Sequence, residues 1–312
     1  MAGQQPRSMA ESEARPAADP GRDLWSIGHL QTLIDRRLRI LIPSREIVPE
    51  TLHRAMGYSL LGPGKRVRPV LTMLTSFHCG RRDLAALDAA CAIEMVHAAS
   101  LVMDDLPAMD NARLRRGQPT VHLAYGEDIA ILSGIALLNL AYGVLATTAG
   151  ITAETRVALV RLAVGAVGSD GLVGGQVMDL KLRDGSISDH QLAKLNELKT
   201  AVLLVAAAEA GAIIAAASDA VVAHVRQFAL DLGAAFQIAD DLLDDPAHAS
   251  QTGKDTGKDA GKPTLASRLG RHEAKELLQR HLASARNHLA ESGTIDSPLT
   301  SLIDHSFSPL MP

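Results

Sequence analysis

Helix-length segments of apolar and small residues follow one another from Leu24 onward, separated by short polar breaks. Ala and Leu dominate and aromatic residues make up only 3% of the chain, a balance that favours helices over sheets. No convincing period-two alternation indicates a strand. The sequence therefore predicts an all-α fold. The expected helices cover residues 24–40, 47–61, 67–79, 83–106, 121–124, 128–149, 153–168, 171–182, 187–216, 219–245, 264–268, 271–291 and 297–306.

The breaks between these segments carry glycine, proline and charged residues. They read "GPGK" at 62–65, "CGRRD" at 79–83, "RRGQP" at 115–119 and "TGKDTGKDAGKP" at 252–263. Residues 1–22 are polar and contain proline, without the apolar segment of a signal peptide. We expect a disordered leader over residues 1–22 and a single domain over residues 23–312.

Composition narrows the class of protein. Hydrophobic residues make up 47% of the 312 residues, enough for a large core, and the formal net charge of −4 does not suggest a nucleic-acid partner. Cys79 and Cys91 are the only cysteines, and two isolated cysteines do not make the repeated spacing of a disulfide framework. They are typical of free or buried thiols in a reducing compartment, and we expect a cytoplasmic protein.

One segment has the length and composition of a membrane span. Residues 129–150 carry no charge. However, they contain several polar residues and three glycines, and no cluster of Lys or Arg flanks them. A helix buried on all sides has the same composition. We therefore expect a buried helix and no membrane span.

Two acidic groups follow apolar helices. The first lies in "SLVMDDLPAMDNARLRRGQPT", residues 100–120, and contains Asp104, Asp105 and Asp110. A regular helix would carry Asp110 to another face than Asp104, but Pro107 cannot continue a regular helix. A bulge at "LPAM" would return Asp110 toward Asp104.

The second group lies in "FQIADDLLDD", residues 236–245. Asp240 and Asp244 share one helix face, with Asp241 close by. Like charges at this spacing are unfavourable without a cation between them. Convergent oxygen ligands suit Mg²⁺, which also accepts substrate phosphate oxygens. The alternative is that each group is a solvated charged face. Two such groups, each after an apolar helix, favour the metal.

Basic residues are distributed in a complementary way. Individually each is weak evidence, since Lys199 can extend along an apolar surface and His97 can be an ordinary core histidine. Together, acids that hold a metal and bases that hold phosphate imply a substrate with a diphosphate, and apolar helix walls imply that its other end is a hydrocarbon. Three basic residues lie in "GPGKRVRP": Lys65, Arg66 and Arg68. "LRRG" contains Arg115 and Arg116, and "LKT" contains Lys199 beside Thr200. The others are His97, seven residues before Asp104, and Lys254, Lys258 and Lys262 in the glycine-rich loop.

At these motifs the sequence resembles the trans-isoprenyl diphosphate synthases, and most closely the bacterial geranylgeranyl diphosphate synthases, from about residue 24 to about residue 306. The motifs that match, in the family's order, are "GPGKRVRP", "DDLPAMDNARLRRGQPT", "GGQVMD" at 174–179, "LKT", "FQIADDLLD" and "GKDTGKDAGKPTL". The resemblance implies the isoprenoid synthase fold, an antiparallel helix bundle around a central cavity, and a homodimer. It implies condensation of isopentenyl diphosphate with dimethylallyl, geranyl or farnesyl diphosphate.

The resemblance also implies residue roles. The catalytic residues would be Asp104, Asp105, Lys199, Asp240 and Asp241. The ligands of Mg²⁺ would be Asp104, Asp105, Asp110, Asp240 and Asp244, which would hold three ions when substrate is bound. The allylic substrate would be bound by Arg115, Lys199, Thr200, Gln237, Lys254 and Lys262. Isopentenyl diphosphate would be bound by Lys65, Arg68, His97 and Arg116. The chain departs from the family at Ala112 and Arg113, where many relatives carry acids, and at Ala201, where glycine often follows. None of these is an expected metal ligand.

Product length is expected to depend on Ala99 and Ser100, about one helical turn before Asp104. Relatives that stop at fifteen carbons tend to carry an aromatic residue at the position of Ala99, so the alanine here favours a twenty-carbon product. Ala99 is alternatively a simple helix-packing residue. The alternatives are a farnesyl or longer-chain synthase, a class I terpene cyclase, a non-catalytic regulatory subunit and a helical nucleotide pyrophosphohydrolase. The aspartates of the second acidic motif and the second set of basic residues disfavour the cyclase, and the two intact acidic motifs disfavour the regulatory subunit. A pyrophosphohydrolase site is usually rich in Glu and would not need the apolar cavity.

Overall fold

The computed structural model describes residues 24–182, 188–243, 268–293 and 297–310. Several expectations lie outside these ranges: the leader over residues 1–22, Asp244, the loop 252–263 with its three lysines, and most of the helix expected over residues 264–268.

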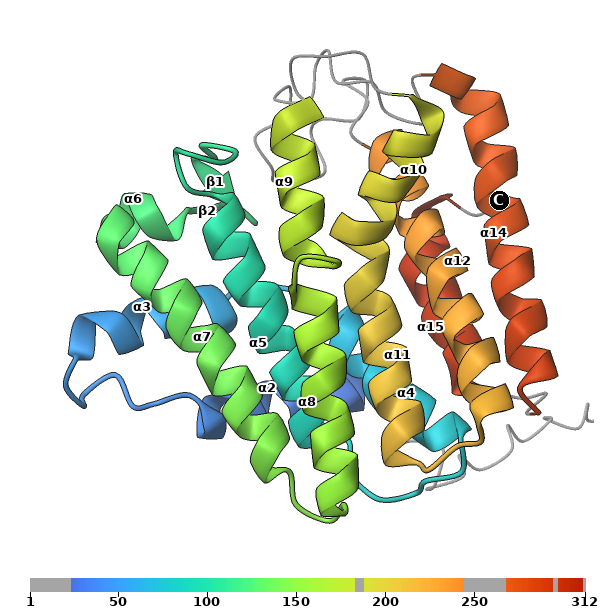
Figure 1. Ribbon diagram of the computed structural model, residues 1–312, viewed down its shortest axis with the longest axis horizontal. Helices are drawn as coiled ribbons and strands as arrows, with labels where there is room; N and C mark the ends of the chain where they lie inside the picture. Colours follow the sequence, from blue (N-terminus) through green and yellow to red (C-terminus); the bar gives the residue numbers. More distant parts are fainter. Residues whose placement is uncertain (1–23, 183–187, 244–267, 294–296, 311–312) are drawn as a thin grey trace, which may run out of the picture.

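The described residues are helical apart from their loops and one small hairpin, so the all-α expectation is confirmed (Figure 1). The helices are α2 (Ile27–Leu41), α3 (Glu50–Leu60), α4 (Val67–His78), α5 (Leu87–Asp104), α6 (Val121–Tyr125), α7 (Glu127–Thr147), α8 (Ala153–Val167), α9 (Leu172–Leu182), α10 (Asp189–Asn196), the π-helical turn η1 (Glu197–Ala201), α11 (Val202–Ile214), α12 (Asp219–Leu243), α14 (Arg271–Glu291), α15 (Pro298–Phe307) and the 3-10 turn η3 (Ser308–Leu310). Most boundaries fall within a few residues of those expected from sequence.

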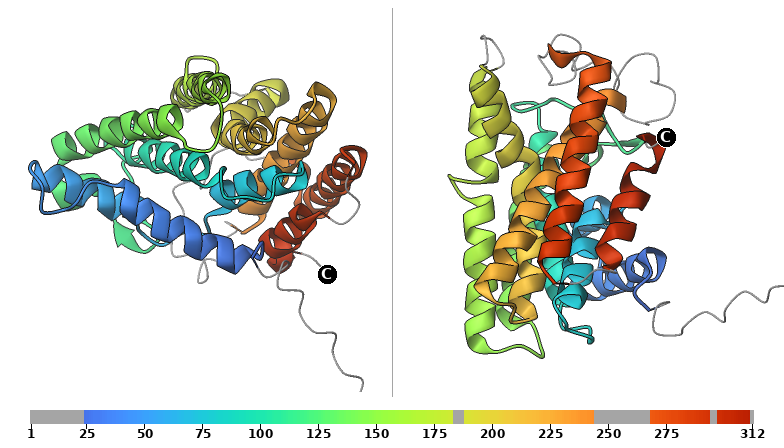
Figure 2. Two further views of the ribbon diagram at one scale, coloured as in Figure 1. Left: turned by 90° about the horizontal axis from the view of Figure 1, so that it is seen from below. Right: turned by 90° about the vertical axis from the view of Figure 1, so that its right-hand side faces the viewer.

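The bundle has a small-residue interior. Figure 2 shows α4 and α5 between α2 on one side and α7, α8 and α11 on the other. Helix α5 packs mainly on α7, and α4 mainly on α11. Alanines occupy much of the buried surface of α5 and α11, which lets neighbouring helices approach closely. At Gly211 an added Cβ would lie 2.4 Å from the carbonyl oxygen of Thr72, so glycine is required where α11 crosses α4.

Two local features differ from the expectation. Residues 187–216 do not form one continuous helix, because the π turn η1 separates α10 from α11. A two-stranded antiparallel hairpin, β1 (Leu114–Arg115) and β2 (Gln118–Pro119), follows the first aspartate group. Its two-residue turn has positive φ at both Arg116 (54°) and Gly117 (77°), the backbone of the tight turns that join paired strands. The strands are too short for a period-two pattern to reveal them.

Helix α7 is not buried on all sides, which corrects the sequence expectation. By length and composition, α7 and the segment Ala153–Leu182 are apolar enough to cross a membrane. One face of α7 packs on α5 through residues such as Gly134 and Leu137. The opposite face exposes Ile131, Leu132 and Ile135 by 39–52%. The described chain therefore has a large apolar surface along α7.

Candidate active site

The first aspartate group forms where α5 ends. The backbone turns sharply after Asp104, and the amide of Asp110 donates to the carbonyl oxygen of Asp104 over 2.9 Å. Asn111 adopts a left-handed conformation (φ 47°) and donates to the carbonyl of Leu106. The return of Asp110 toward Asp104, expected from Pro107, is therefore present. Burial raises the pKa of Asp104 to about 6; Lys199 opposes this shift and the charge of Asp110 adds to it.

Asp105 has a different environment from its neighbour. Its side chain is buried, and Arg115 from β1 pairs with it, with 2.5 Å between Nη2 of Arg115 and Oδ1 of Asp105. Burial raises the pKa of Asp105 and the Arg115 hydrogen bonds lower it. The structure thus brings Asp104 and Asp110 together and joins Asp105 to Arg115.

The second aspartate group lies in the last turns of α12. Asp240 is exposed, whereas Asp241 is half-buried and accepts a hydrogen bond from Nε2 of Gln237 over 2.9 Å. Oε1 of Gln237 in turn accepts from the hydroxyl of Thr200 over 2.9 Å. This chain of hydrogen bonds connects α12 to η1.

The π turn η1 carries Lys199 and Thr200 into the site. Isolated π turns inside helices occur often at functional sites. Glycines on both sides permit close packing: a Cβ on Gly175 of α9 would lie 2.8 Å from Cβ of Leu198, and one on Gly233 of α12 would lie 2.5 Å from Cβ of Ala201. The turn is therefore held between two helices.

Lys199 connects the "GGQVMD" motif to the first aspartate group. Its Nζ donates to Oδ2 of Asp179 in α9 over 2.6 Å, and its charge also acts on Asp104. The motif is recognisable in the sequence, but nothing in the sequence indicates a role for Asp179. The structure shows that Asp179 positions Lys199.

A cluster of cationic and imidazole groups lies between α4, α5 and the hairpin. Nε2 of His97 is 3.5 Å from Nη1 of Arg68 and 3.4 Å from Nη2 of Arg116. Burial, followed by the charges of Arg68 and Arg116, lowers the pKa of His97 well below its ordinary value, so the imidazole is neutral and accepts hydrogen bonds. Nη1 of Arg116 donates to the carbonyl of Pro63 over 2.7 Å, and Lys65 is exposed on the same loop.

Arg68 has unused hydrogen-bonding capacity. Its Nε is buried and has no hydrogen-bond partner among the described residues. Burial lowers the pKa of Arg68, and the nearby charge of Asp240 raises it. A buried guanidinium without a full set of partners is costly, and a multivalent anion between Arg68, His97 and Arg116 would satisfy it.

The two aspartate groups therefore share one end of the bundle. Asp104 interacts electrostatically with Lys199 of η1, and Asp240 interacts with Arg68 of α4. Figure 1 shows the C-terminal ends of α5 and α12 and the hairpin at the same end of the bundle. Residues that lie far apart in sequence are thus combined in one polar site.

Arg66 supports this site from beneath, although sequence reasoning gave it no separate role. It is buried, its Nε lies 2.8 Å from Oδ1 of Asp35, and its Nη1 lies 3.0 Å from Oε1 of Glu94. Its φ of 50° turns the chain into α4, and Nη2 donates to the carbonyl of Gly62. Arg66 therefore fixes the loop that carries Lys65 and the start of α4, where Arg68 lies.

The two positions expected to control product length lie on α5. Ala99 is buried in the main core, only 5% exposed. Ser100 is half-buried and its hydroxyl donates to the carbonyl of His97 over 2.9 Å. A Cβ added to Gly134 of α7 would lie 3.0 Å from Sδ of Met103 and at an ordinary contact distance, 3.7 Å, from the Ala99 carbonyl oxygen. Ala99 thus lies where α5 faces α7.

The donor atoms of this site fit Mg²⁺. The acidic groups offer carboxylate oxygens only. Burial raises the pKa of Asp104, and repulsion by the charge of Asp110 adds to this shift. A hard divalent cation between Asp104 and Asp110 would relieve that repulsion.

Known proteins resemble this chain over most of its length. The polyprenyl synthetase family model matches residues 49–292. The geranylgeranyl diphosphate synthase of Pantoea ananas is 44% identical over 259 residues, which cover 82% of this chain and 84% of that protein.

Solved structures agree with these matches. The apo structure of an FPP/GFPP synthase from Zymomonas mobilis superimposes with a TM-score of 0.81 at 35% identity, covering 91% of this chain and 99% of that one. A geranyltransferase from Helicobacter pylori, complexed with magnesium and isoprenyl diphosphate, gives a TM-score of 0.83 at 27% identity over 94% of this chain and 100% of that one. The architecture is that of the all-α prenyltransferases. The family match is more specific: the chain belongs to the polyprenyl synthetase family.

Proposed function

We propose that this protein condenses isopentenyl diphosphate with an allylic diphosphate to give geranylgeranyl diphosphate and diphosphate. The observation that carries the proposal is the convergence of Asp104, Lys199, Arg68 and Asp240 on one end of the bundle. The 44% identity to a geranylgeranyl diphosphate synthase supports this product.

The acidic groups hold the metal in this proposal. Asp104, the last residue of α5, and Asp110, in the turn that follows, would hold Mg²⁺. Asp240 of α12 would hold it together with Asp244, which lies outside the described residues. We propose three ions with substrate bound. Mg²⁺ supplies positive charge that stabilises the leaving diphosphate. Asp105 acts through Arg115, which its carboxylate orients.

The basic groups divide between two substrates. The allylic diphosphate binds beside the metal to Lys199, Thr200, Gln237 and Arg115. Lys254 and Lys262, which lie outside the described residues, bind it as well. Lys65, Arg68, His97 and Arg116 bind the diphosphate of isopentenyl diphosphate. The unpartnered Nε of Arg68 supports this second site, because an anion there would complete its hydrogen bonding.

These residues stabilise the charges that develop in the reaction and position the reacting carbon atoms of the two substrates. The allylic carbon–oxygen bond breaks, the double bond of isopentenyl diphosphate attacks the resulting cation, and the new adduct loses a proton to the released diphosphate. Lys199 and the arginines favour the step because they stabilise negative charge as it develops.

The surface supports a homodimer. The exposed faces of α7, α8 and α9 carry Ile131, Leu132 and Ile135, together with Val157, Val164, Val173 and Val177. Exposed apolar side chains on these helices are typical of a protein interface, and a second copy of the chain would cover them. Cys79 and Cys91 are both free thiols, which supports a cytoplasmic location.

Product analysis tests the proposed function. The purified chain is incubated with Mg²⁺, isopentenyl diphosphate and each allylic primer in turn, and the products are identified by mass spectrometry. We expect a twenty-carbon diphosphate. A main product of fifteen carbons would identify a farnesyl diphosphate synthase, and one of twenty-five carbons a longer-chain synthase. Consumption of an allylic diphosphate to a hydrocarbon without isopentenyl diphosphate would indicate a terpene cyclase.

A further inference from the structure

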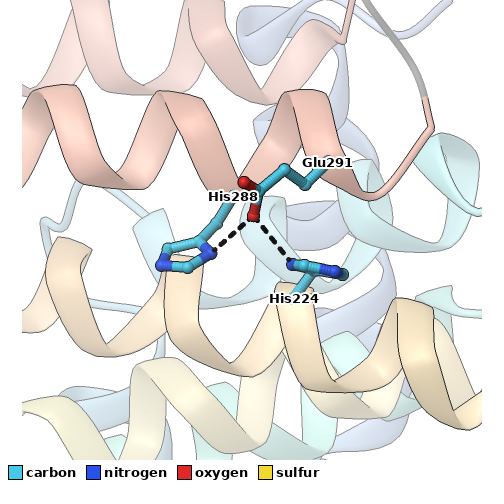
Figure 3. Close-up of side chains that lie close together, drawn as sticks. All are labelled: His224, His288 and Glu291. Carbon is cyan, nitrogen blue, oxygen red and sulfur yellow. Dashed lines mark ion pairs between the residues drawn. The ribbon is translucent and has the colours of Figure 1, made fainter.

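Three side chains at the far end of the bundle form a group with the composition of a transition-metal site. His224 lies near the start of α12, and His288 and Glu291 lie in the last turns of α14, which runs antiparallel to it (Figures 1 and 3). One ligand atom from each residue lies within 4.8 Å of the other two. In Figure 3 the carboxylate of Glu291 lies between the two imidazoles.

The distances suit a tetrahedral ion. Oε2 of Glu291 is 3.2 Å from Nδ1 of His224 and 3.5 Å from Nδ1 of His288. Ligands bonded at about 2.0–2.1 Å to a tetrahedral Zn²⁺ are about 3.3 Å apart. Nδ1 of His288 is also buried and has no hydrogen-bond partner among the described residues. A cation shared by this nitrogen and the carboxylate of Glu291 would satisfy the hydrogen-bonding atom that is otherwise buried without a partner.

A second pair of side chains lies behind this group. Oδ2 of Asp231 lies 3.9 Å from Nε2 of His288, and its Oδ1 lies 2.8 Å from Nδ1 of His281. Asp231 follows His224 by seven residues on α12, and His281 precedes His288 by seven on α14, so both pairs face across the antiparallel helices. A carboxylate behind a ligating imidazole is the usual outer contact of a metal-bound histidine.

We propose that His224, His288 and Glu291 bind a divalent cation of the Zn²⁺ class and so connect α12 to α14. Two imidazoles and one carboxylate favour Zn²⁺ or another late first-row ion over Mg²⁺, and a water completes four-coordination. All three side chains are partly exposed, which gives the ion access. His224 precedes Asp240 by sixteen residues on α12, roughly 24 Å along the helix, so the site is distinct from the aspartate groups.

Co²⁺ is the probe for this site. The full chain is treated with chelator, supplied with excess Mg²⁺ to occupy oxygen-only sites, and titrated with Co²⁺. We expect one Co²⁺ per chain with the intense visible absorption of four-coordinate cobalt, which Zn²⁺ displaces. His224→Ala and His288→Gln should each weaken binding by about 100-fold, and Asp231→Asn by about 10-fold because it loses only the outer contact. His305→Ala, which replaces an exposed histidine on α15, is the control and should bind as the wild type.

Thermal unfolding gives a readout independent of the spectrum. Zn²⁺ at about 100 times its dissociation constant should raise the Tm of the wild-type chain by about 5 °C, and should leave His288→Gln unchanged. Circular dichroism verifies that each variant is folded. Equal Co²⁺ binding by the wild type and the variants, or no four-coordinate spectrum, would overturn the proposal. So would a Tm that responds to pH alone, since the contact would then be a protonated imidazole–carboxylate pair. Prenyl transfer is not part of either readout, so the metal site and the proposed function are tested separately.

Discussion

At the residue scale, Asp104 holds its proton to higher pH than an ordinary aspartate. Burial raises its pKa from 3.8 to about 6. In the folded chain without metal, this carboxyl therefore contributes stability that is fully present below pH 3.8 and is lost as the pH rises through about 6. Asp104→Asn cannot ionise and should lack this loss. The difference in unfolding free energy between the two proteins should change by about 2 kcal/mol between pH 4 and pH 7.

Denaturant unfolding in the presence of EDTA, repeated across that pH range, measures this effect. The other titrating groups are common to both proteins and largely cancel in the difference. Mg²⁺ requires the ionised carboxylate, so its stabilising effect on the wild type should increase above pH 6. Parallel pH profiles for wild type and Asp104→Asn would contradict the raised pKa.

Arg66 is the buried charge on which the loop before α4 depends. Its side chain and that of Glu94 are each only 4% exposed. Arg66→Met leaves Glu94 buried without its partner and should lower the unfolding free energy by about 3–5 kcal/mol. Arg54→Met is the matched control, because Arg54 pairs with Glu50 on the surface with both side chains at least half exposed. Its cost should be at most about 1 kcal/mol. Urea unfolding of both variants measures the contrast.

Ala99 provides a residue-scale test of the product. It is buried in the main core, about one turn before the end of α5. We expect the hydrocarbon chain of the product to extend into the space below Asp104. A phenylalanine at position 99 would fill part of that space and leave room for a shorter chain. Ala99→Phe should shift the main product from twenty to fifteen carbons, measured by mass spectrometry. An unchanged product distribution in a folded, active Ala99→Phe protein would reject this placement of the hydrocarbon chain.

At the scale of elements, the π turn η1 depends on glycines in its neighbours. A Cβ on Gly233 would lie 2.5 Å from Cβ and 2.7 Å from Cα of Ala201, so Gly233→Ala must displace η1. Thr200 would then lose its alignment with Gln237. We expect kcat/KM for the allylic substrate to fall at least about tenfold, since small displacements of positioning groups are costly. KM for isopentenyl diphosphate should change less.

Gly28→Ala is the control for Gly233→Ala. Gly28 is also helical, and an added Cβ there meets no atom within 4 Å. It should leave the kinetics unchanged and stabilise the chain slightly, because alanine favours a helix by about 0.5–1 kcal/mol over glycine. Equal kinetic effects of the two substitutions would show that the close approach at Gly233 does not position η1.

Helix periodicity predicted most elements but not their interruptions. The apolar pattern continues through residues 187–216, and nothing in it marks the extra residue of η1, because a π turn is stabilised by tertiary packing against α9 and α12. Pro107, by contrast, is a covalent constraint, and the bulge that it predicts is present. The exposed face of α7 was missed because an apolar helix gives the same pattern whether its own chain or a second copy covers it.

At the scale of the whole molecule, motif residues were easier to predict than the residues that hold them. The sequence singled out the two aspartate groups and the basic motifs, whose roles stay predictions, and the structure places Asp104 near Lys199 and Asp240 near Arg68. The contacts of Asp179 with Lys199 and of Arg66 with Glu94 join separate helices, so no local spacing reveals them. The His224 group likewise requires the antiparallel packing of α12 on α14.

The exposed apolar face of α7 makes a prediction about assembly. Ile131, Leu132 and Ile135 are 39%, 52% and 49% exposed, and burying them against a second copy removes apolar surface from water. Charges placed there would be desolvated in the dimer but not in the monomer. Leu132→Asp combined with Ile135→Asp should therefore convert a dimer to a monomer in sedimentation velocity. Ile40→Asp, at a residue of α2 that is 62% exposed, is the control and should stay dimeric. A monomeric wild type, or a double variant that still sediments as a dimer, would show that this face is not the interface.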